Sequence, residues 1–345
     1  MSRLCSFFRL SRPARVPSCT LLCLFLWVPA VLAAEPRPGD KPLRVLTIGN
    51  SFAENSTAFL REICQDRKAP LHLGTANIPG SSMERHVQAL EAYLDNPHGT
   101  AGRPYLKWDS DKQPPRAYSL VEILKQEPWD IVTIQQFSGH SFKPETYEPH
   151  AATLVRTVQS HAPTAEILVH MTWAYRADHE WFSKGTLTRD SMYDGLRGAY
   201  LGLSNRYGLR ILPVGAAFEH ALRTPLWSFR HPDPDFNYSS PPAGAVPRQD
   251  GSLHTGWYWG RRARDPQPAF RLDATHANVA GQYLGALVFY AVLFDADPQE
   301  VAYKPDALNA EQASSLRRAA HQAVQEFASH NAGRQKSTSL PAAAR

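Results

Sequence analysis

Short apolar runs alternate with longer amphipathic segments along most of this chain. Five runs are mostly apolar, as strands buried on both faces of a parallel sheet are. In the segments between them, apolar residues recur at helical spacing. The strand candidates are residues 43–50, 71–78, 130–136, 166–173 and 210–215, and the helix candidates are residues 56–67, 82–94, 118–127, 147–161 and 188–206.

This alternation predicts an α/β fold, because parallel strands joined by helices need right-handed crossover connections. Five such strands form a parallel sheet that helices cover on both faces, which is a three-layer α/β/α sandwich. A further segment, residues 278–294, is apolar nearly all round. We expect it to form a helix that packs deep against the sheet.

Two long segments interrupt the pattern. Residues 95–117 are rich in proline, glycine and charge, and residues 223–270 hold many prolines with little periodicity. Long loops in a compact domain are usually functional or disordered. The second segment is rich in Trp and Tyr, which favours an ordered cap or substrate-facing loop. We therefore expect one large domain over residues 35–330 that includes this cap, and a disordered tail over residues 331–345.

The N-terminus has the pattern of a secretory leader. Four arginines precede the apolar run CTLLCLFLWVPAVLA, which ends in small residues near Ala34. A basic start, a short apolar middle and a small-residue cleavage site are typical of a signal peptide. The run is short for a membrane span and contains Pro29. The sequence therefore predicts a signal peptide over residues 1–34, a secreted or periplasmic protein, and no stable membrane anchor after cleavage.

Removing this leader changes the charge and the cysteine count. The chain of 345 residues has 37 Lys and Arg against 32 Asp and Glu, and the loss of four leader arginines leaves 33 against 32. A nearly neutral mature protein gives no support for nucleic-acid binding. Three of the four cysteines also lie in the leader, so only Cys64 remains and no internal disulfide can form.

Residues that could carry acyl-transfer chemistry follow several predicted strands. In an open parallel sheet, ligands bind beyond the carboxyl ends of the strands. Ser51 follows the first strand, and Asp273 and His276 precede the last core helix. Serine becomes a nucleophile when a base takes its proton, and histidine becomes that base when a third group orients it. Each residue alone also fits an ordinary turn or helix cap.

An acyl-transfer intermediate also needs hydrogen-bond donors for its oxyanion. The backbone N–H groups of Ser51 and Gly80 are candidates, since both follow strands at the same edge. A glutamine at the end of the third strand is a further candidate, and strand alternation sends only one of Gln135 and Gln136 to the site. We favour Gln135. The candidates for substrate binding are Asn50, Gln136, Trp173, Trp257 and Trp259.

These blocks resemble the SGNH/GDSL hydrolase superfamily. More narrowly, LTIGNSF, DIVTIQQFS and the spacing D-x-x-H-x-N-x-x-G-x-Y-L are similar to a bacterial branch described as a domain of unknown function. The resemblance spans about residues 43–295 and implies a flavodoxin-like fold. It implies that Ser51 is the nucleophile, His276 the base and Asp273 its orienting acid, with Gly80 and Gln135 in the oxyanion hole.

Two blocks depart from the usual superfamily pattern. Gly-Asn-Ser replaces Gly-Asp-Ser at residues 49–51, and a glutamine pair replaces the usual Gly-x-Asn-Asp. The sequence has no Gly-x-Ser-x-Gly elbow, which disfavours the ordinary α/β-hydrolase fold. It has no H-E-x-x-H metal motif either. We expect a serine esterase that acts on an acyl ester, most simply an acetyl group on a carbohydrate, and needs no metal or organic cofactor.

Two other functions remain open from the sequence. A carbohydrate-binding protein could keep this fold without turnover, and a flavodoxin-like protein could bind phosphate at the loop after the first strand. The second alternative leaves Asp273 and His276 without a role, and the loop lacks a glycine series for phosphate.

Overall fold

The structure is a computed structural model that describes residues 41–106, 116–229, 232–261 and 266–334. All these residues belong to one compact unit. The predicted signal peptide, residues 1–34, lies outside the described residues, as does most of the predicted tail. The last described helix, α10, runs to Ala332.

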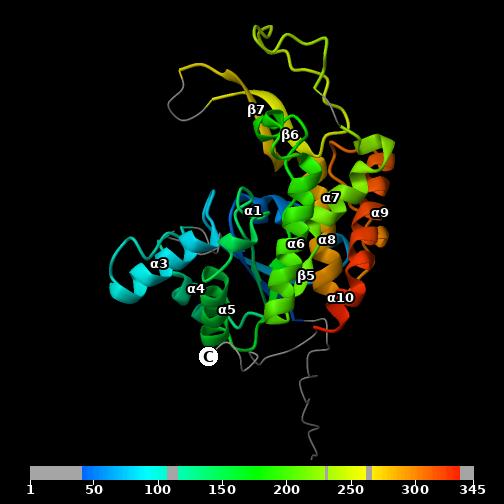
Figure 1. The fold of residues 1–345 in the computed structure, drawn as a ribbon. Helices are drawn as coiled ribbons and strands as arrows, with labels where there is room; N and C mark the ends of the chain where they lie inside the picture. Colours follow the sequence, from blue (N-terminus) through cyan, green and yellow to red (C-terminus); the bar gives the residue numbers. More distant parts are fainter. Residues whose placement is uncertain (1–40, 107–115, 230–231, 262–265, 335–345) are drawn as a thin grey trace, which may run out of the picture. The chain divides into compact units, whose positions relative to one another are not determined.

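A five-stranded parallel sheet forms the centre of this unit (Figure 1). Its strand order is β2-β1-β3-β4-β5, which is the flavodoxin-like order. In the register of the three central strands, Ile48 of β1 lies beside Ile134 of β3, which lies beside Val169 of β4. The predicted α/β fold with a five-stranded parallel sheet is confirmed. The strands are β1 (Leu43–Gly49), β2 (Leu71–Asn77), β3 (Ile131–Ile134), β4 (Glu166–His170) and β5 (Arg210–Leu212).

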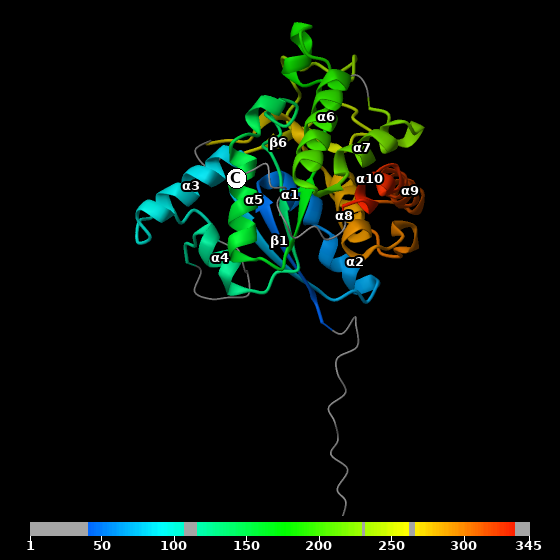
Figure 2. The same ribbon diagram turned by 60° about the horizontal axis from the view of Figure 1, so that its bottom comes forward.

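Helices cover both faces of the sheet. The helices α1 and α2 pack against α8 on one face, and α9 packs outside α8 and α7. The helices α3 and α4 pack against α5 on the other face, where α6 follows β4 (Figures 1 and 2). The helices are α1 (Ser51–Thr57), α2 (Leu60–Asp66), α3 (Met83–Asp95), α4 (Leu120–Gln126), α5 (His150–His161), α6 (Arg189–Tyr207), α7 (Val214–Leu222), α8 (Val279–Phe294), α9 (Ala310–Glu326) and α10 (Ala328–Ala332).

Several predicted ends of strands and helices are wrong, and the structure gives the reason. The strands β3, β4 and β5 end at Ile134, His170 and Leu212, earlier than the apolar runs do. The apolar residues beyond these ends pack in the core as turns or, after Pro213, as the start of α7. The first helix begins at Ser51 rather than at residue 56, because Asn50 caps it directly after β1. Ser51 is therefore the first residue of a helix.

An antiparallel hairpin occupies part of the segment predicted as a cap loop. It consists of β6 (His254–Gly260) and β7 (Ala269–Ala277), and it packs against α1 through β7. An ordered cap or substrate-facing loop over residues 223–270 stays a prediction, and the two strands were not predicted. Asp273 and His276 thus lie on β7, not in a free turn before α8. Short 3-10 helices lie at Pro144–Thr146, Glu180–Lys184, Pro225–Trp227 and Pro298–Glu300.

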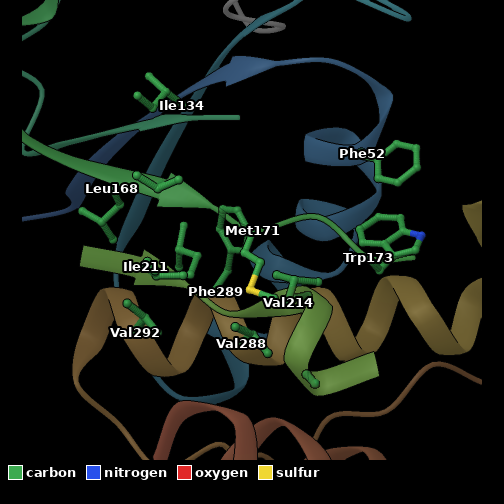
Figure 3. Packing of buried hydrophobic residues seen from close by; sticks show 14 of the residues in the cluster. Phe52, Ile134, Leu168, Met171, Trp173, Ile211, Val214, Val288, Phe289 and Val292 are labelled. Atoms are coloured by element: carbon green, nitrogen blue, oxygen red, sulfur yellow. The ribbon is translucent and has the colours of Figure 1, made fainter. Parts of the chain in front are cut away.

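The helix α8 is the most buried helix of the core, as its apolar sequence predicts. Phe289 of α8 lies against the sheet near Met171 and Val214, while Phe52 and Trp173 lie together beyond the strand ends (Figure 3). Gly285 of α8 faces Ser56 of α1, and a Cβ atom at position 285 would lie 2.8 Å from the Ser56 Cα. This close approach fixes α1 against α8.

Replacing Gly285 by Ala should therefore separate α1 from α8. We expect Gly285→Ala to lower the free energy of unfolding by about 1–3 kcal/mol, as overpacked cores do. The matched control is Gly198→Ala in α6, where nothing lies within 4 Å of the added Cβ. That change should raise stability by about 0.5–1 kcal/mol, the usual gain for Gly to Ala inside a helix. Urea denaturation measures both, and an equal effect of the two variants would contradict the packing.

Candidate active site

The turn after β1 is built from three residues with separate tasks. Gly49 lies against the Gln135 side chain, where a Cβ atom would come within 2.7 Å of Gln135 Oε1. The Asn50 side chain caps α1, since its Oδ1 accepts a hydrogen bond of 3.0 Å from the Phe52 N–H. Ser51 follows as the first residue of α1. The sequence Gly-Asn-Ser therefore places one hydroxyl at a helix N-terminus at the edge of the sheet.

The structure brings Ser51, His276 and Asp273 together. The Ser51 Oγ lies 2.8 Å from His276 Nε2, although the two residues are 225 positions apart. On the other side of the ring, His276 Nδ1 lies 2.9 Å from Asp273 Oδ2. The ionised carboxylate can only accept, so His276 Nδ1 carries the proton and donates to it, and the unprotonated Nε2 accepts a hydrogen bond from the Ser51 hydroxyl. This is the geometry that a serine nucleophile with a histidine base requires.

Asp273 is held in its ionised form. Burial raises the pKa of this carboxyl group, but hydrogen bonds from the His276 ring, the His276 N–H and the Thr275 N–H outweigh that effect. The net result is a pKa well below the usual range for Asp. A carboxylate that stays ionised can stabilise the imidazolium that forms when His276 takes a proton.

An irregularity in β7 aims His276 at the nucleophile. The hairpin register shifts between His254 and Gly256, so residues 274–276 bulge out of the ladder. Three hydrogen bonds hold this bulge and the residue after it. The Arg176 N–H donates to the Ala274 carbonyl at 2.8 Å, Trp173 Nε1 donates to the Thr275 carbonyl at 2.9 Å, and the Ala277 N–H donates to Asn55 Oδ1 at 2.9 Å. Asn55 belongs to α1, so the helix that carries Ser51 also anchors the strand that carries His276.

Trp173 lies behind the site. Its ring stacks between Phe52 at 4.2 Å and Phe218 at 4.7 Å, and the side chain is fully buried. Among the predicted substrate-binding residues, Trp173 is therefore placed in the core, where it supports the His276 bulge. Asn50 is 1 % exposed and its amide is occupied by backbone partners, so the structure gives it a positioning role as well.

The loop after β2 lies beside the nucleophile turn. Asn50 Nδ2 donates to the Ser81 carbonyl at 2.9 Å, and the Ile78 N–H donates to the Gly49 carbonyl at 2.9 Å. Gly80 is exposed in this loop, has φ +66°, and would have nothing within 4 Å of an added Cβ. Within the described ranges, the N–H groups of Ser51 and Gly80 have no hydrogen-bond acceptor. Both amides are available to a ligand.

The two glutamines after β3 differ in their surroundings. Gln136 is fully buried; its Oε1 accepts from the Met83 and Phe137 N–H groups and its Nε2 donates to the Thr146 carbonyl. It does not face the site. Gln135 is 2 % exposed and reaches the nucleophile turn, where its Nε2 donates to Asn50 Oδ1 at 2.8 Å. Its role as an oxyanion donor stays a prediction, because one of its N–H groups already holds Asn50.

Gln135 belongs to a buried polar chain whose hydrogen-bond directions can be assigned. Asn50 Oδ1 accepts from Gln135 Nε2, so Gln135 Oε1 must face His170 Nδ1, which lies 3.0 Å away. That nitrogen therefore carries the proton, and His170 Nε2 accepts from the Ser56 hydroxyl at 3.1 Å. The chain links β3, β4 and α1 to the turn that holds Ser51.

Three buried histidines support the strand ends around the site. Burial lowers the pKa of His86 to about 4 and those of His170 and His254 to about 3. His86 binds the Gly49 carbonyl at 3.0 Å, and His254 binds the Ala174 carbonyl at 3.1 Å. All three rings are therefore neutral in the folded protein at neutral pH.

A cleft of about 650 Å³ lies beside the His276 ring. The hairpin supplies one wall of the cleft through Trp257, Tyr258 and Leu272. The other wall includes Glu180, the first residue of the 3-10 helix Glu180–Lys184. Trp257, one of the predicted binding residues, lines this cleft. Trp259 is not among its lining residues; its Nε1 donates to the Ala245 carbonyl and ties the hairpin to the preceding loop. Tyr258, from the aromatic segment predicted to face a substrate, also lines the cleft, whereas sequence reasoning missed Asp178, His179 and Glu180.

The sequence matches the model of the DUF4886 family, described as a domain of unknown function, over residues 44–229. The chain belongs to this family, which confirms the unknown-function branch that the motifs indicate. A crystal structure of a DUF4886 family protein from Bacteroides uniformis is 21% identical, covers 83% of this chain and 95% of its own, and has a TM-score of 0.62. The two proteins share the fold.

Two other solved structures are similar at a lower level. A proposed SGNH hydrolase from Slackia heliotrinireducens is 20% identical, with 72% of this chain and 97% of that chain covered and a TM-score of 0.42. A proposed GDSL-like lipase from Parabacteroides merdae is 13% identical, with 74% and 96% covered and a TM-score of 0.40. A comparison with curated proteins finds no match.

No group of three or more His, Cys, Asp or Glu side chains in the described ranges is arranged to hold a metal ion. Among the helices of the described chain, none combines the length and the apolar character that a membrane span requires.

The three neutral histidines make stability depend on pH. Their folded pKa values lie below the value of about 6.5 in the unfolded chain, so unfolding takes up protons at acidic pH. The contribution of these neutral rings to the free energy of unfolding is fully present above pH 6.5 and is lost as the pH falls below that value. Between pH 7.5 and pH 5, we expect a loss of about 2 kcal/mol per histidine.

Urea denaturation at the two pH values measures this loss. His86→Gln should reduce the pH dependence by about 2 kcal/mol, one histidine's share. His98→Gln, at an exposed loop position, should leave it unchanged. A wild-type stability that is equal at pH 5 and pH 7.5 would contradict the assignment of these rings as neutral.

Proposed function

We propose that the protein is a serine esterase that hydrolyses an acyl ester, most simply an acetyl ester of a carbohydrate. One observation carries the proposal: Ser51 Oγ, His276 and Asp273 form an unbroken relay of 2.8 Å and 2.9 Å at the edge of the sheet. A serine hydroxyl in a plain helix turn does not need a histidine held in one tautomer by an ionised carboxylate. Such a relay lowers the barrier to nucleophilic attack.

The reaction proceeds in two stages. Ser51 Oγ attacks the ester carbonyl while its proton passes to His276 Nε2, and Asp273 stabilises the imidazolium. The Ser51 and Gly80 N–H groups donate to the oxyanion of the tetrahedral intermediate. The intermediate collapses to an acyl-enzyme, and the alcohol leaves with the proton from His276. Water then attacks the acyl-enzyme with the same base, which releases the acid and restores Ser51.

The cleft supports a carbohydrate as the alcohol. It lies next to His276, which must protonate the leaving oxygen, and Trp257 and Tyr258 present aromatic surface along it. Aromatic rings offer apolar faces with a polar edge, and sugar rings have apolar C–H faces that pack on such surfaces. We further propose that residues 1–34 are a signal peptide and that the mature enzyme acts outside the cytoplasm.

Substitution of the relay should abolish ester hydrolysis. We expect Ser51→Ala and His276→Ala to lower kcat toward para-nitrophenyl acetate by at least about 1,000-fold, and Asp273→Asn by about 10,000-fold, because the base loses its orientation. Ser314→Ala, on the surface of α9, is the control and should keep wild-type activity.

A fluorophosphonate probe tests the nucleophile separately from turnover. The wild-type protein should be labelled, and Ser51→Ala should not. Hydrolysis and labelling that persist in Ser51→Ala would place the chemistry elsewhere. A folded wild-type protein that is neither labelled nor active, yet binds acetylated glycans, would instead favour the carbohydrate-binding function.

The predicted signal peptide is tested by expressing the full chain, residues 1–345, in a bacterial host that secretes proteins. We expect the exported protein to begin at about Glu35, since the small residues before this position form the cleavage site. N-terminal sequencing and fractionation give the result. A full-length protein retained in the cytoplasm would contradict the proposal.

A further inference from the structure

The charges around the cleft are unevenly compensated. Three carboxylates line it, and two of them have fixed partners. Asp273 is bonded to His276, and Asp178 forms a bidentate ion pair with Arg176, with two distances of 2.7 Å. Asp178 also accepts from Trp257 Nε1 at 3.2 Å. These two carboxylates hold the walls of the cleft and are not free for a ligand.

Glu180 is different. It is exposed at the start of the 3-10 helix, and its carboxylate has no ion pair or hydrogen bond within the ranges that the structure describes. Among the described residues that line the cleft, none is Lys or Arg. Arg176 lies behind Asp178 and is 2 % exposed, and Arg271, which pairs with Tyr258 across the hairpin, donates to the Gly260 carbonyl.

The neighbouring histidine does not offset this charge. His179 Nδ1 accepts a hydrogen bond of 3.2 Å from the Trp181 N–H, so this nitrogen carries no proton. Burial also lowers the pKa of His179, which keeps the ring neutral. The free groups of the cleft are therefore one carboxylate and the aromatic surface of Trp257 and Tyr258.

The two aromatic residues have different freedom. Trp257 is fixed by its bond to Asp178 and by stacking on Phe270 at 4.7 Å, so it forms a rigid wall. Tyr258 is 36% exposed, and its hydroxyl has no partner in the described part of the chain. A rigid apolar wall with a free hydroxyl and a free carboxylate suits a polyol ring, whose hydroxyl groups can donate to both oxygens.

We infer that this cleft binds the alcohol part of the ester as an uncharged sugar ring, and that Glu180 selects against esters of anionic sugars such as uronic acids. The inference rests on the proposed esterase function and adds a substrate class and a specificity residue to it. A uronate carboxylate in this cleft would face Glu180 with no cation among the described residues that line it. A neutral sugar of the same shape meets no such repulsion.

The test compares two substrates that differ at one group. They are an acetylated methyl glucoside and the matching acetylated methyl glucuronoside, and the readout is the ratio of their kcat/KM values at low ionic strength. We expect wild-type enzyme to favour the glucoside by about fivefold, which is the scale of a single exposed charge interaction. Glu180→Gln should lower this ratio about threefold, and Glu180→Lys should reverse the preference. Added salt at 0.5 M should shrink the wild-type ratio.

The control is Glu91→Gln, which removes an exposed carboxylate from α3 and should keep the wild-type ratio. An unchanged kcat/KM ratio in Glu180→Gln, or a wild-type preference for the glucuronoside, would overturn the inference. If the enzyme still hydrolyses para-nitrophenyl acetate in that case, the proposed esterase function stands. Inactivity toward all three esters would overturn the proposed function and the inference with it.

Discussion

The hydrogen bond between Ser51 and His276 is the constraint on which the rest of the site depends. It joins the start of α1 to the end of an antiparallel hairpin, two parts of the chain that are far apart in sequence. Asn55, Trp173 and the close approach of Gly285 to Ser56 all act to keep that distance short. The distance between Ser51 and His276 therefore depends on the packing of α1 against α8.

A chain of buried, hydrogen-bonded side chains also supports the turn that holds Ser51. Asn50, Gln135 and His170 have their hydrogen-bond directions fixed by one another, so none can rotate without leaving a buried group unpaired. In the Gly-Asp-Ser block that residues 49–51 resemble, the middle residue is a carboxylate, whereas this chain has the amide of Asn50. An amide can donate to the Ser81 carbonyl and accept from the Phe52 N–H together, whereas a carboxylate can only accept. The asparagine thus suits a site in which the turns after β1 and β2 are joined directly.

The sequence predicted the sheet well because buried parallel strands are apolar throughout, and their ends brought Ser51 and Gly80 to one edge. It misplaced the start of α1, because the polar residues of this short helix have no apolar periodicity and the Asn50 cap decides its position. It missed β6 and β7, since the alternation around Trp257 is brief and lies among prolines. Glu180 gave no signal at all, because only the folded chain brings it beside His276, whereas Tyr258 was noted only as part of an aromatic segment. The family match also ends at residue 229, so the segment carrying Asp273 lies beyond it.

The hairpin has two tasks at once. The strand β7 carries His276, and β6 carries the aromatic wall of the cleft. Because antiparallel strands move as one ladder, a leaving group on this wall would move with His276, the residue proposed to protonate it. Insertions or deletions that reshape the hairpin for another alcohol would shift the imidazole as well, so in this architecture substrate range and turnover rate are expected to evolve together.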